Sequence, residues 1–429
     1  MLVSGIHAQD PAADGGEILT LNDAVILALQ QNFGVQIAEN EIEIAETLNN
    51  WGNAGRYPGV SAQTGYSISS NNLDQRLSNG TNIKRNGATF QSQNASVSAV
   101  WRIYNGGRVN AVKERLEIAE VLARSGRLDE ANQVAYEMIS AYLNILRFKA
   151  QQNATIESMK LMEERKNLAE NRWNIGTASK SDFLQAQNDY NEASALVIQM
   201  ESNIARAKTE VNRLLNRSPF HVFTPSDALP QYPDLLKEDF MASIDSLNPA
   251  VLIAKDQLRI LAVQRTEINS LRLPTVSMNA GAGLNNSNNS AGFTLRNTTY
   301  GPQAGVSVAI PIFQGNVVKQ NLRVNEIEQF NQRIRIDQLK NNLYAAYATG
   351  LYNYRYAKNK YDLELQNLEV AKESNFIAME RFRKASITTV ELRQVQLLLI
   401  DSQTRLINAT YEMKQAEADL LFLMGKLVD

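Results

Sequence analysis

Apolar residues recur at alternating steps of three and four positions through much of the chain. In the segments 181–216 and 389–427 this spacing persists over many turns. Heptad spacing of this kind is typical of helices that pack as coiled coils. The positions that carry it are Ala186, Tyr190, Ala193, Val197, Met200, Ile204, Ala207, Val211 and Leu214, and then Val395, Leu399, Ser402, Leu406, Ala409, Met413, Ala416, Leu420 and Leu423.

Proline placement predicts further helices. Residues 59–218 and 312–429 contain no proline, a residue that costs about 3 kcal/mol inside a helix. The additional helices that we expect span 33–55, 107–172, 249–272 and 316–381. Each half of the chain would then supply one rod of roughly 100 Å, at about 1.5 Å per residue, and two shorter rods stacked end to end.

The predicted helix 107–172 carries two apolar stripes. One comprises Leu128, Ala131, Ala135, Met138, Tyr142 and Ile145, and the other comprises Tyr136, Ile139, Leu143, Leu146 and Ala150. A helix with two seams packs against a neighbour on each side, as every member of a closed ring of helices does. One broad face in a compact bundle is the alternative interpretation.

Between the helices of each half, apolar and polar residues alternate, which predicts strands with one apolar face. We expect transmembrane strands at about 58–70, 91–104, 274–284 and 301–312, lengths that suit tilted strands crossing a bilayer. The apolar positions are Val60, Ala62, Thr64, Tyr66 and Ile68, then Ala95, Val97, Ala99, Trp101 and Ile103, then Val276, Met278, Ala280, Ala282 and Leu284, and finally Ala304, Val306, Val308, Ile310 and Ile312. An antiparallel sheet on a soluble core is the alternative.

Four strands are too few to close a membrane barrel, because bacterial outer-membrane barrels begin at about 8 strands. Two copies of the chain would supply eight strands, and three would supply twelve. Three copies also bring twelve helical rods, and a ring of twelve at spacings near 10 Å leaves a bore of about 28 Å. The bore that two copies leave is far narrower, so the pattern favours a homotrimer.

The chain contains an internal duplication. Residues 172–187 align with 381–396 at an offset of 209, and four of the ten prolines crowd into 219–233, between the two copies. The resulting division is an N-terminal segment 1–19 with a candidate signal remnant and part of an equatorial region, a first repeat 20–216, an equatorial linker 217–235 and a second repeat 236–429.

Composition narrows the function classes. The net charge is −2, with 43 basic and 45 acidic residues interspersed, which argues against a nucleic-acid partner. The absence of cysteine excludes disulfides, thiol catalysis and a lipidated cysteine. No apolar run approaches the roughly 20 residues of a spanning helix, and no nucleophile–base pair, metal cluster or phosphate loop occurs. We therefore expect neither an enzyme nor a cofactor.

Three features together resemble the outer-membrane efflux protein family, the TolC-like outer membrane factors. They are the duplicated helix–strand–strand–helix unit, the turn Tyr104-Asn-Gly-Gly-Arg108, and Arg172-Trp-Asn-Ile-Gly176 followed by Asp182-Phe-Leu. The likeness covers about residues 20–427. It implies an α+β membrane protein, built from two repeats, in the outer membrane of a Gram-negative bacterium. Four strands per protomer would form a trimeric twelve-stranded β-barrel, continuous with a long periplasmic α-helical barrel.

The resemblance also implies partners and a function. A homotrimer of this kind docks to a periplasmic adaptor (membrane fusion) protein, which an inner-membrane RND, ABC or MFS transporter feeds. The chain would be the passive exit duct of an efflux or type I secretion system, gated at its periplasmic helical tips. A periplasmic structural coiled-coil protein and a general porin are the alternatives.

The tips at about 172–187 and 381–396 would form the entrance and the adaptor-contact surface. The residues implied in adaptor contact are Arg172, Gly176, Thr177, Ser179, Lys180, Arg381, Ala385 and Ser386. The residues implied at the entrance and gate are Asp182, Ile387, Glu391, Arg393 and Gln394. Ser179 with Asp182, and Thr388 with Glu391, also fit capping boxes, so helix capping alone is the alternative role for the two carboxylates.

The second tip departs from the family pattern. The family carries two carboxylates there, of which Glu391 keeps the first, while Gln394 replaces the second and Arg393 adds a cation. Three copies of Glu391 would still form an acidic ring that favours cations. Ala385 stands where the family has glycine, which allows a different turn.

The family's latch pairs the carboxylate at Asp182 with an arginine whose position is Ile387 here, so that latch is absent. Lys180 and Arg393 are the candidate substitutes for the missing arginine.

Overall fold

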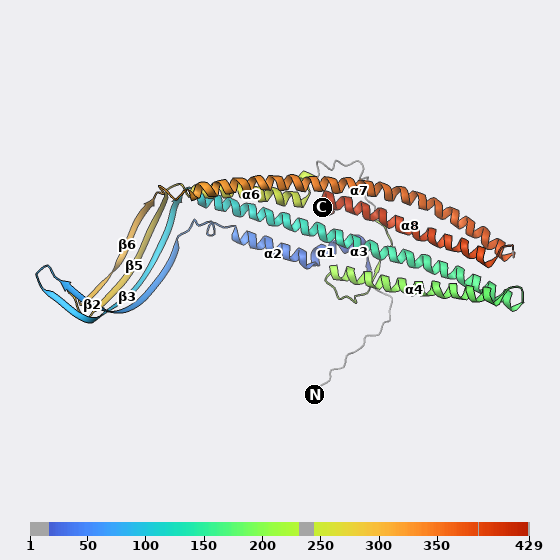
Figure 1. The fold of residues 1–429 in the computed structure, drawn as a ribbon, viewed down its shortest axis with the longest axis horizontal. Helices are drawn as coiled ribbons and strands as arrows, with labels where there is room; N and C mark the ends of the chain where they lie inside the picture. Colours follow the sequence, from blue (N-terminus) through green and yellow to red (C-terminus); the bar gives the residue numbers. More distant parts are fainter. Residues whose placement is uncertain (1–16, 231–243, 385, 428–429) are drawn as a thin grey trace, which may run out of the picture. The chain divides into compact units, whose positions relative to one another are not determined.

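The computed structural model describes residues 17–230, 244–384 and 386–427. Two compact units make up the chain (Figure 1). The helix unit contains residues 1–40, 124–253 and 337–429, and the sheet unit contains 41–123 and 254–336. The predictions for the signal remnant, for part of the equatorial linker and for Ala385 lie outside the described residues.

The sheet unit contains one four-stranded antiparallel sheet. Its strands are β2 (Gly59–Arg76), β3 (Asn82–Asn105), β5 (Thr275–Asn289) and β6 (Arg296–Ala309), in the order β2-β3-β5-β6 (Figure 1). The strands β2 and β3 extend beyond the predicted ends at 70 and 91. They form a hairpin that continues past the last residues that β3 pairs with β5.

The register of the sheet aligns the apolar positions of all four strands on one face. Val97 of β3 pairs with Ala62 on one side and with Ala282 on the other. The opposite face is polar, and there the hydroxyls of Ser61 and Ser98 lie 3.2 Å apart. Among the described residues nothing covers the apolar face, where Val306 is 67% exposed. A continuous apolar surface of this kind marks contact with a partner or a membrane.

Seven helices have defined bounds in the described residues. They are α1 (Leu21–Gln31), α2 (Phe33–Leu48), α3 (Arg108–Asn174), α4 (Lys180–Leu214), α6 (Pro249–Ser270), α7 (Val317–Arg383) and α8 (Thr389–Met424). The helices α3 and α7 are 67 residues long each. Within the described ranges, no helix contains a stretch apolar enough to cross a bilayer.

The predicted helix 33–55 begins where α2 begins, at Phe33, but its predicted end is wrong and the helix α1 before it was not predicted. The helical segment begins earlier, at Leu21, and Asn32 divides it, because the backbone there is extended (φ −64°, ψ 134°). The side chain of Asn32 then accepts a hydrogen bond from the Gly34 amide at 2.8 Å and so starts α2. The segment ends at Leu48, ahead of turns that include Gly55 at φ +82°.

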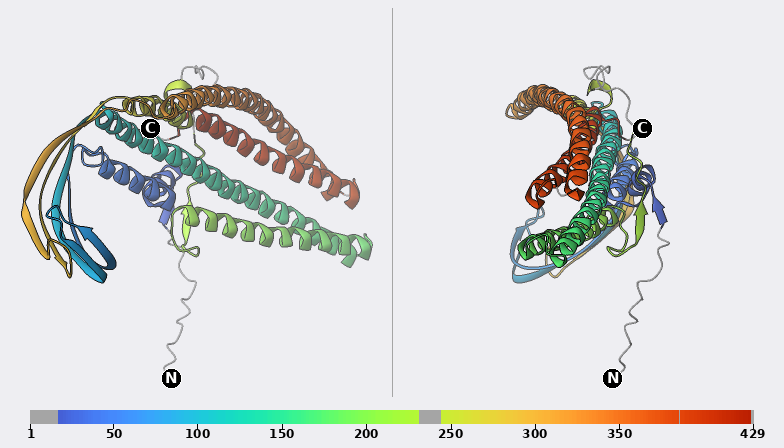
Figure 2. Two further views of the ribbon diagram at one scale, coloured as in Figure 1. Left: turned by 60° about the vertical axis from the view of Figure 1, so that its left-hand side comes forward. Right: turned by 90° about the vertical axis from the view of Figure 1, so that its right-hand side faces the viewer.

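In the helix unit, α3 lies between α4 and α8. Figure 2 shows α7, α8, α3 and α4 side by side in that order, as does Figure 1. The first predicted stripe packs against α4, since Met138 and Tyr142 share a buried cluster with Val211. The second stripe packs against α8, since Ile139 and Leu143 share a cluster with Ala418. The prediction that α3 has two neighbours is therefore confirmed.

A short parallel pair of strands, β1 (Glu17–Leu19) and β4 (Phe223–Pro225), covers one face of α3. The Tyr142 hydroxyl donates to the carbonyl oxygens of Leu19 at 2.7 Å and Ser226 at 3.1 Å. Burial raises the pKa of Tyr142 to about 12. The tyrosine thus ties these strands to the long helix.

Left-handed backbone positions recur at the offset of 209 that the sequence shows. Gly106 (φ +66°) corresponds to Gly315 (φ +61°), and Asn216 (φ +51°) corresponds to Gly425 (φ +70°). Both members of the first pair lie in strand-to-helix turns, and both members of the second lie just beyond a helix end. Sites of this kind favour glycine or asparagine.

Candidate functional site

The predicted tips are the closed ends of two helical hairpins in the helix unit. The first hairpin joins α3 to α4, and the second joins α7 to α8. Both turns use the same backbone bond, because the Thr177 amide donates to the Arg172 oxygen at 2.9 Å and the Ser386 amide donates to the Arg381 oxygen at 2.9 Å. Gly176 adopts φ +76° in the first turn, and at this position only glycine is free of strain.

The two returning helices start with capping boxes, as the sequence predicts. The Asp182 amide donates to the Ser179 hydroxyl oxygen at 3.1 Å, and the Asp182 carboxylate accepts from the Ser179 amide at 3.3 Å. In the second tip, the Glu391 carboxylate accepts from the Thr388 amide at 2.8 Å. Both carboxylates are therefore fixed beside the end of a hairpin.

The two hairpins contact each other just inside the tips. The Arg172 guanidinium lies over the Phe382 ring, 4.2 Å from its centroid, and donates to the Phe382 carbonyl oxygen. Phe382 is fully buried with Leu392, and Ile387 packs against that cluster. The position of the family's latch arginine is therefore occupied by an apolar side chain that belongs to the core.

Aromatic residues stiffen the first tip. The rings of Trp173 and Phe183 stack with centroids 5.5 Å apart and an interplanar angle of 5°. The Lys180 ammonium lies 5.6 Å from the Trp173 ring centroid. Lys180 therefore contacts an aromatic face on its own hairpin.

A buried polar cluster joins the hairpins further from the tips, and Asp189 of α4 is at its centre. The Asp189 carboxylate pairs with Arg165 of α3, and it accepts from Arg393 of α8 at 2.9 Å and from Gln185 at 2.9 Å. Arg165 also donates to the side-chain oxygen of Gln396 of α8 at 3.2 Å. Two of these contacts, those made by Arg393 and Gln396, cross from one hairpin to the other.

The electrostatics of this cluster depend on Asp189. Arg165 is fully buried and Asp189 nearly so, whereas Arg393 is partly exposed. Burial lowers the pKa of Arg165, and the Asp189 carboxylate opposes that shift. An unpaired guanidinium at this depth would be strongly destabilising, so the carboxylate stabilises the packing of α3 on α4, and its bond from Arg393 adds a link to the second hairpin.

Three further predicted residues lie at or near the tips. Thr177, Ser386 and Gln394 are exposed at or near the two tips. Arg393, a candidate partner for Asp182, donates instead to Asp189.

Sequence reasoning missed Arg165 and Asp189. A signal was available for Asp189, because it occupies a seam position of α4, three residues after Ala186 and four before Ala193. A charged residue on an apolar seam requires a buried partner.

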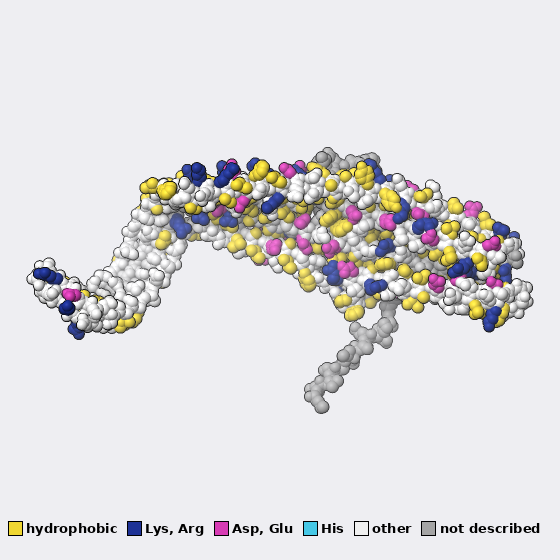
Figure 3. Space-filling model, in the orientation of Figure 1, with side chains coloured by type: hydrophobic (Ala, Val, Ile, Leu, Met, Phe, Trp, Pro, Cys, Tyr) yellow, Lys and Arg dark blue, Asp and Glu magenta, His cyan; other side chains and the backbone are white. Residues whose placement is uncertain are grey.

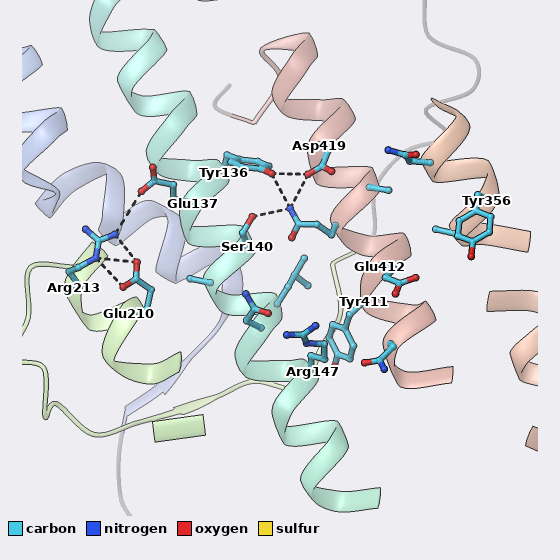
Figure 4. A pocket seen from close by; sticks show the side chains of 18 residues that line it. Tyr136, Glu137, Ser140, Arg147, Glu210, Arg213, Tyr356, Tyr411, Glu412 and Asp419 are labelled. Carbon is cyan, nitrogen blue, oxygen red and sulfur yellow. Dashed lines mark hydrogen bonds and ion pairs between the residues drawn. The ribbon is translucent and has the colours of Figure 1, made fainter. Parts of the chain in front are cut away.

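A hollow of about 1000 Å³ lies on another part of the helix unit, in the face of α3 turned away from β1 and β4. Residues of α3, α4, α7 and α8 line it (Figure 4). The Tyr136 hydroxyl donates to Asp419 at 2.9 Å, and Gln415 donates to Ser140 at 2.9 Å and to Asp419 at 2.9 Å. The hollow thus carries a network of polar contacts beside apolar side chains such as Leu143 and Tyr411.

Known proteins with a similar sequence or fold were compared with this chain. The family model described as outer membrane efflux protein matches residues 25–217 and 246–426. The chain belongs to the outer membrane efflux protein family. Membership makes it an outer-membrane protein with a large helical portion in the periplasm.

Individual members of the outer membrane efflux protein family are similar over almost the whole chain. The outer membrane efflux protein BepC of Brucella suis is 20% identical, over 95% of this chain and 86% of its own length. The CmeC outer membrane channel of Campylobacter jejuni has a TM-score of 0.77 at 13% identity, with 95% and 86% of the two chains covered. The open state of the MtrE channel of Neisseria gonorrhoeae has a TM-score of 0.71 at 18% identity, with 95% and 89% covered. The fold is that of outer membrane efflux channels.

Proposed function

We propose that three copies of the chain form a passive exit duct across the outer membrane and periplasm, gated at the hairpin tips. The observation that carries this proposal is the sheet, which has an uncovered apolar face and two unpaired edges. A sheet of this kind is stable in lipid when its edges are paired. Closure into a barrel pairs both edges and turns the polar face toward water.

The strand directions allow closure. The edges are β2 and β6, and adjacent strands of the sheet alternate in direction. The strand β6 of one copy therefore meets β2 of the next in antiparallel orientation. Four strands from each of three copies give a twelve-stranded barrel, an even number within the known range for such barrels.

The helix unit has two unpaired flanks of its own. The layer ends with α4 on one side and α7 on the other (Figure 2). Both end helices expose large apolar residues, among them Leu196 and Ile198 of α4 and Leu363 and Val370 of α7. If α4 of one copy packs against α7 of the next, all the seams are buried and the layers close into a ring.

A ring of this kind has a polar interior. The hollow lined by Tyr136, Gln415 and Asp419 would face the water-filled bore, because β1 and β4 cover the opposite face of α3. A wet polar wall suits passive passage of cargo, and an inner-membrane RND, ABC or MFS transporter would supply the driving force. The same duct would serve efflux or type I secretion.

The gate in this proposal is the set of contacts between the two hairpins. Opening the entrance requires the α7–α8 hairpin to move relative to the α3–α4 hairpin, which separates Arg393 and Gln396 from Asp189 and Arg165. Three Glu391 side chains would place an acidic ring at the entrance and favour cations.

The tips are also the proposed contact for a periplasmic adaptor. Both tips present apolar side chains to water, with Ile175 74% exposed and Val390 72% exposed. The exposed polar residues Thr177, Ser179, Lys180 and Ser386 surround them. An apolar centre with a polar rim is the usual composition of a protein interface.

The test is to extract the protein from outer membranes in detergent, measure its mass and reconstitute it in planar bilayers. We expect a trimer with a helix-dominated circular dichroism spectrum and a gated conductance. A monomer that stays in aqueous buffer without detergent would refute the proposal. A spectrum dominated by strands would favour a general porin.

A further inference from the structure

The charged residues of the sheet are unevenly distributed along its strands. Only six occur in residues 59–105 and 275–309, which contain all four strands and the loops within each hairpin. They are Asp74, Arg76, Lys84, Arg85, Arg102 and Arg296. Arg102 lies near the end of β3 that leads into α3, and the other five lie toward the opposite end of the sheet (Figure 3).

The register gives the position of Arg296 relative to the apolar rows. On β5 and β6 the last apolar pair in that direction is Leu284 with Tyr300, whereas on β2 the apolar positions continue to Ile68. Arg296 lies four residues beyond Tyr300 in β6, on the same face of the sheet, because four is an even number of residues. It pairs with Asn288, which pairs with Gln91, and Gln91 pairs with Ile68, so Arg296 lies in the row of the last apolar residue of β2. Four residues correspond to about 13 Å along a strand, or about 10 Å along the bilayer normal at a usual tilt.

The extended β2–β3 hairpin carries further cations. Arg76 lies an even number of residues after Tyr66 in β2, so both side chains belong to the same face of that strand. Lys84 pairs with Asp74 in the register and is 75% exposed, and their ion pair of 3.4 Å is open to solvent. A surface pair of this kind is weak and leaves the ammonium available.

The opposite face of the hairpin is covered by the β5–β6 loop. Ala291 of that loop is buried, and Gly292 lies beside the side chains of Leu73 and Gln75. The loop thus leaves open the face that carries Arg76 and Lys84. With one acidic and four basic residues, this end of the sheet has a local charge of +3.

We propose that Arg296, with Arg76 and Lys84, binds the phosphate groups of an anionic glycolipid in the outer leaflet. The inference rests on the proposed function, in which the apolar face of the sheet contacts lipid. Guanidinium groups bind phosphate through two parallel hydrogen bonds. Cations beside a bilayer attract anionic headgroups. Arg296 shares a row with Ile68, the last apolar residue of β2, and Arg76 and Lys84 continue the basic surface further along the β2–β3 hairpin.

The test incubates the detergent-purified full-length protein with bis-phosphorylated lipid A or with its dephosphorylated form, and counts bound lipid by native mass spectrometry. We expect retention of the phosphorylated lipid only. Arg296→Gln should weaken its binding about fivefold, the effect of removing one cation near a charged surface. Arg76→Gln with Lys84→Gln should weaken it further.

The matched control is Arg102→Gln, which removes an arginine from the other end of the same sheet and should leave lipid binding unchanged. Equal retention of the dephosphorylated lipid, or unchanged binding to Arg296→Gln, would overturn the inference. So would displacement of the lipid by inorganic phosphate at a few millimolar, which would indicate a site for free anions. The mass of the lipid-free protein is measured first, so a monomer would refute the proposed function separately.

Discussion

The contact between the hairpins makes a quantitative prediction for Asp189→Asn. This change removes the only carboxylate that pairs with Arg165 among the described residues, and Arg165 is fully buried. Loss of one partner of a buried ion pair costs about 3–5 kcal/mol. The bond from Arg393 at 2.9 Å weakens as well, but it contributes less because the arginine is partly exposed.

The pair itself lies within the α3–α4 hairpin, but α8 covers it in the closed arrangement through Arg393 and Gln396. If separation of the hairpins admits water to the unpaired Arg165, part of this free energy favours the open state. A loss of about 3 kcal/mol changes that equilibrium roughly 100-fold. We therefore expect Asp189→Asn to raise the open probability of the reconstituted channel in planar bilayers by more than tenfold. Arg393→Gln should give a smaller increase, because it removes one bond between the hairpins without leaving Arg165 unpaired.

The matched control is Glu210→Gln in the same helix. Glu210 pairs with Arg213 at 2.7 Å on an exposed surface, so its loss should change neither opening nor thermal unfolding measurably. Circular dichroism distinguishes global unfolding from opening. The double variant Arg165→Met with Asp189→Leu removes both buried charges, so it leaves no unpaired charge in the cluster. A well-folded Asp189→Asn trimer with wild-type open probability would refute the gating role of the contact.

Three further predictions concern the tip, a turn and the β1–β4 contact. Glu391→Gln keeps a side-chain oxygen for the cap but removes the charge, so reversal potentials should show a cation preference reduced several-fold. Gly106→Ala should lower the yield of folded protein more than Gly107→Ala, because both residues have positive φ but only at Gly106 would a Cβ meet the Ser270 oxygen, at 2.7 Å. Tyr142→Phe should lower the free energy of unfolding by about 1–2 kcal/mol in thermal melts. The folded-state pKa of Tyr142, about 12, exceeds its ordinary value of 10, so the wild type should lose stability as the pH rises from 10 through 12, and the variant should lose less.

Each of these predictions has an outcome that contradicts it. An unchanged cation preference in Glu391→Gln would remove the acidic ring from the proposal. Equal yields of the two glycine variants would mean that left-handed strain, not the close approach to Ser270, limits the turn. Identical alkaline unfolding of wild type and Tyr142→Phe would show that folding does not raise the pKa of Tyr142.

Local patterns predicted the secondary structure well where one periodicity persisted. The seam through Met138 and Tyr142 and the seam through Ile139 and Leu143 pack as their spacing required, because each repeats with the helical period. The capping boxes at Ser179 and Thr388 were also predictable, since a cap involves residues only three positions apart.

The sequence predicted a helix that begins at residue 33 but not the helix α1 that ends just before Asn32. Apolar spacing continues on both sides of this residue, and the extended backbone is stabilised by a partner far away in the chain. The Asn32 side chain donates to the Leu214 carbonyl oxygen at 3.2 Å, across 182 positions of sequence. Only a folded chain brings these two groups together.

By itself, the sequence determined which segments form helices and strands, their duplication and the family. It also determined which faces of these elements are apolar and become buried or contact lipid. These properties follow from residue type and short-range periodicity. The tertiary structure decided that Asp189 contacts both Arg165, 24 residues away in the sequence, and Arg393, 204 residues away. It also decided that Ile387 packs against a core cluster and that Arg296 shares a row with Ile68 at the end of the apolar face. Contacts between distant residues depend on how helices and strands pack and pair, and no local pattern encodes that register.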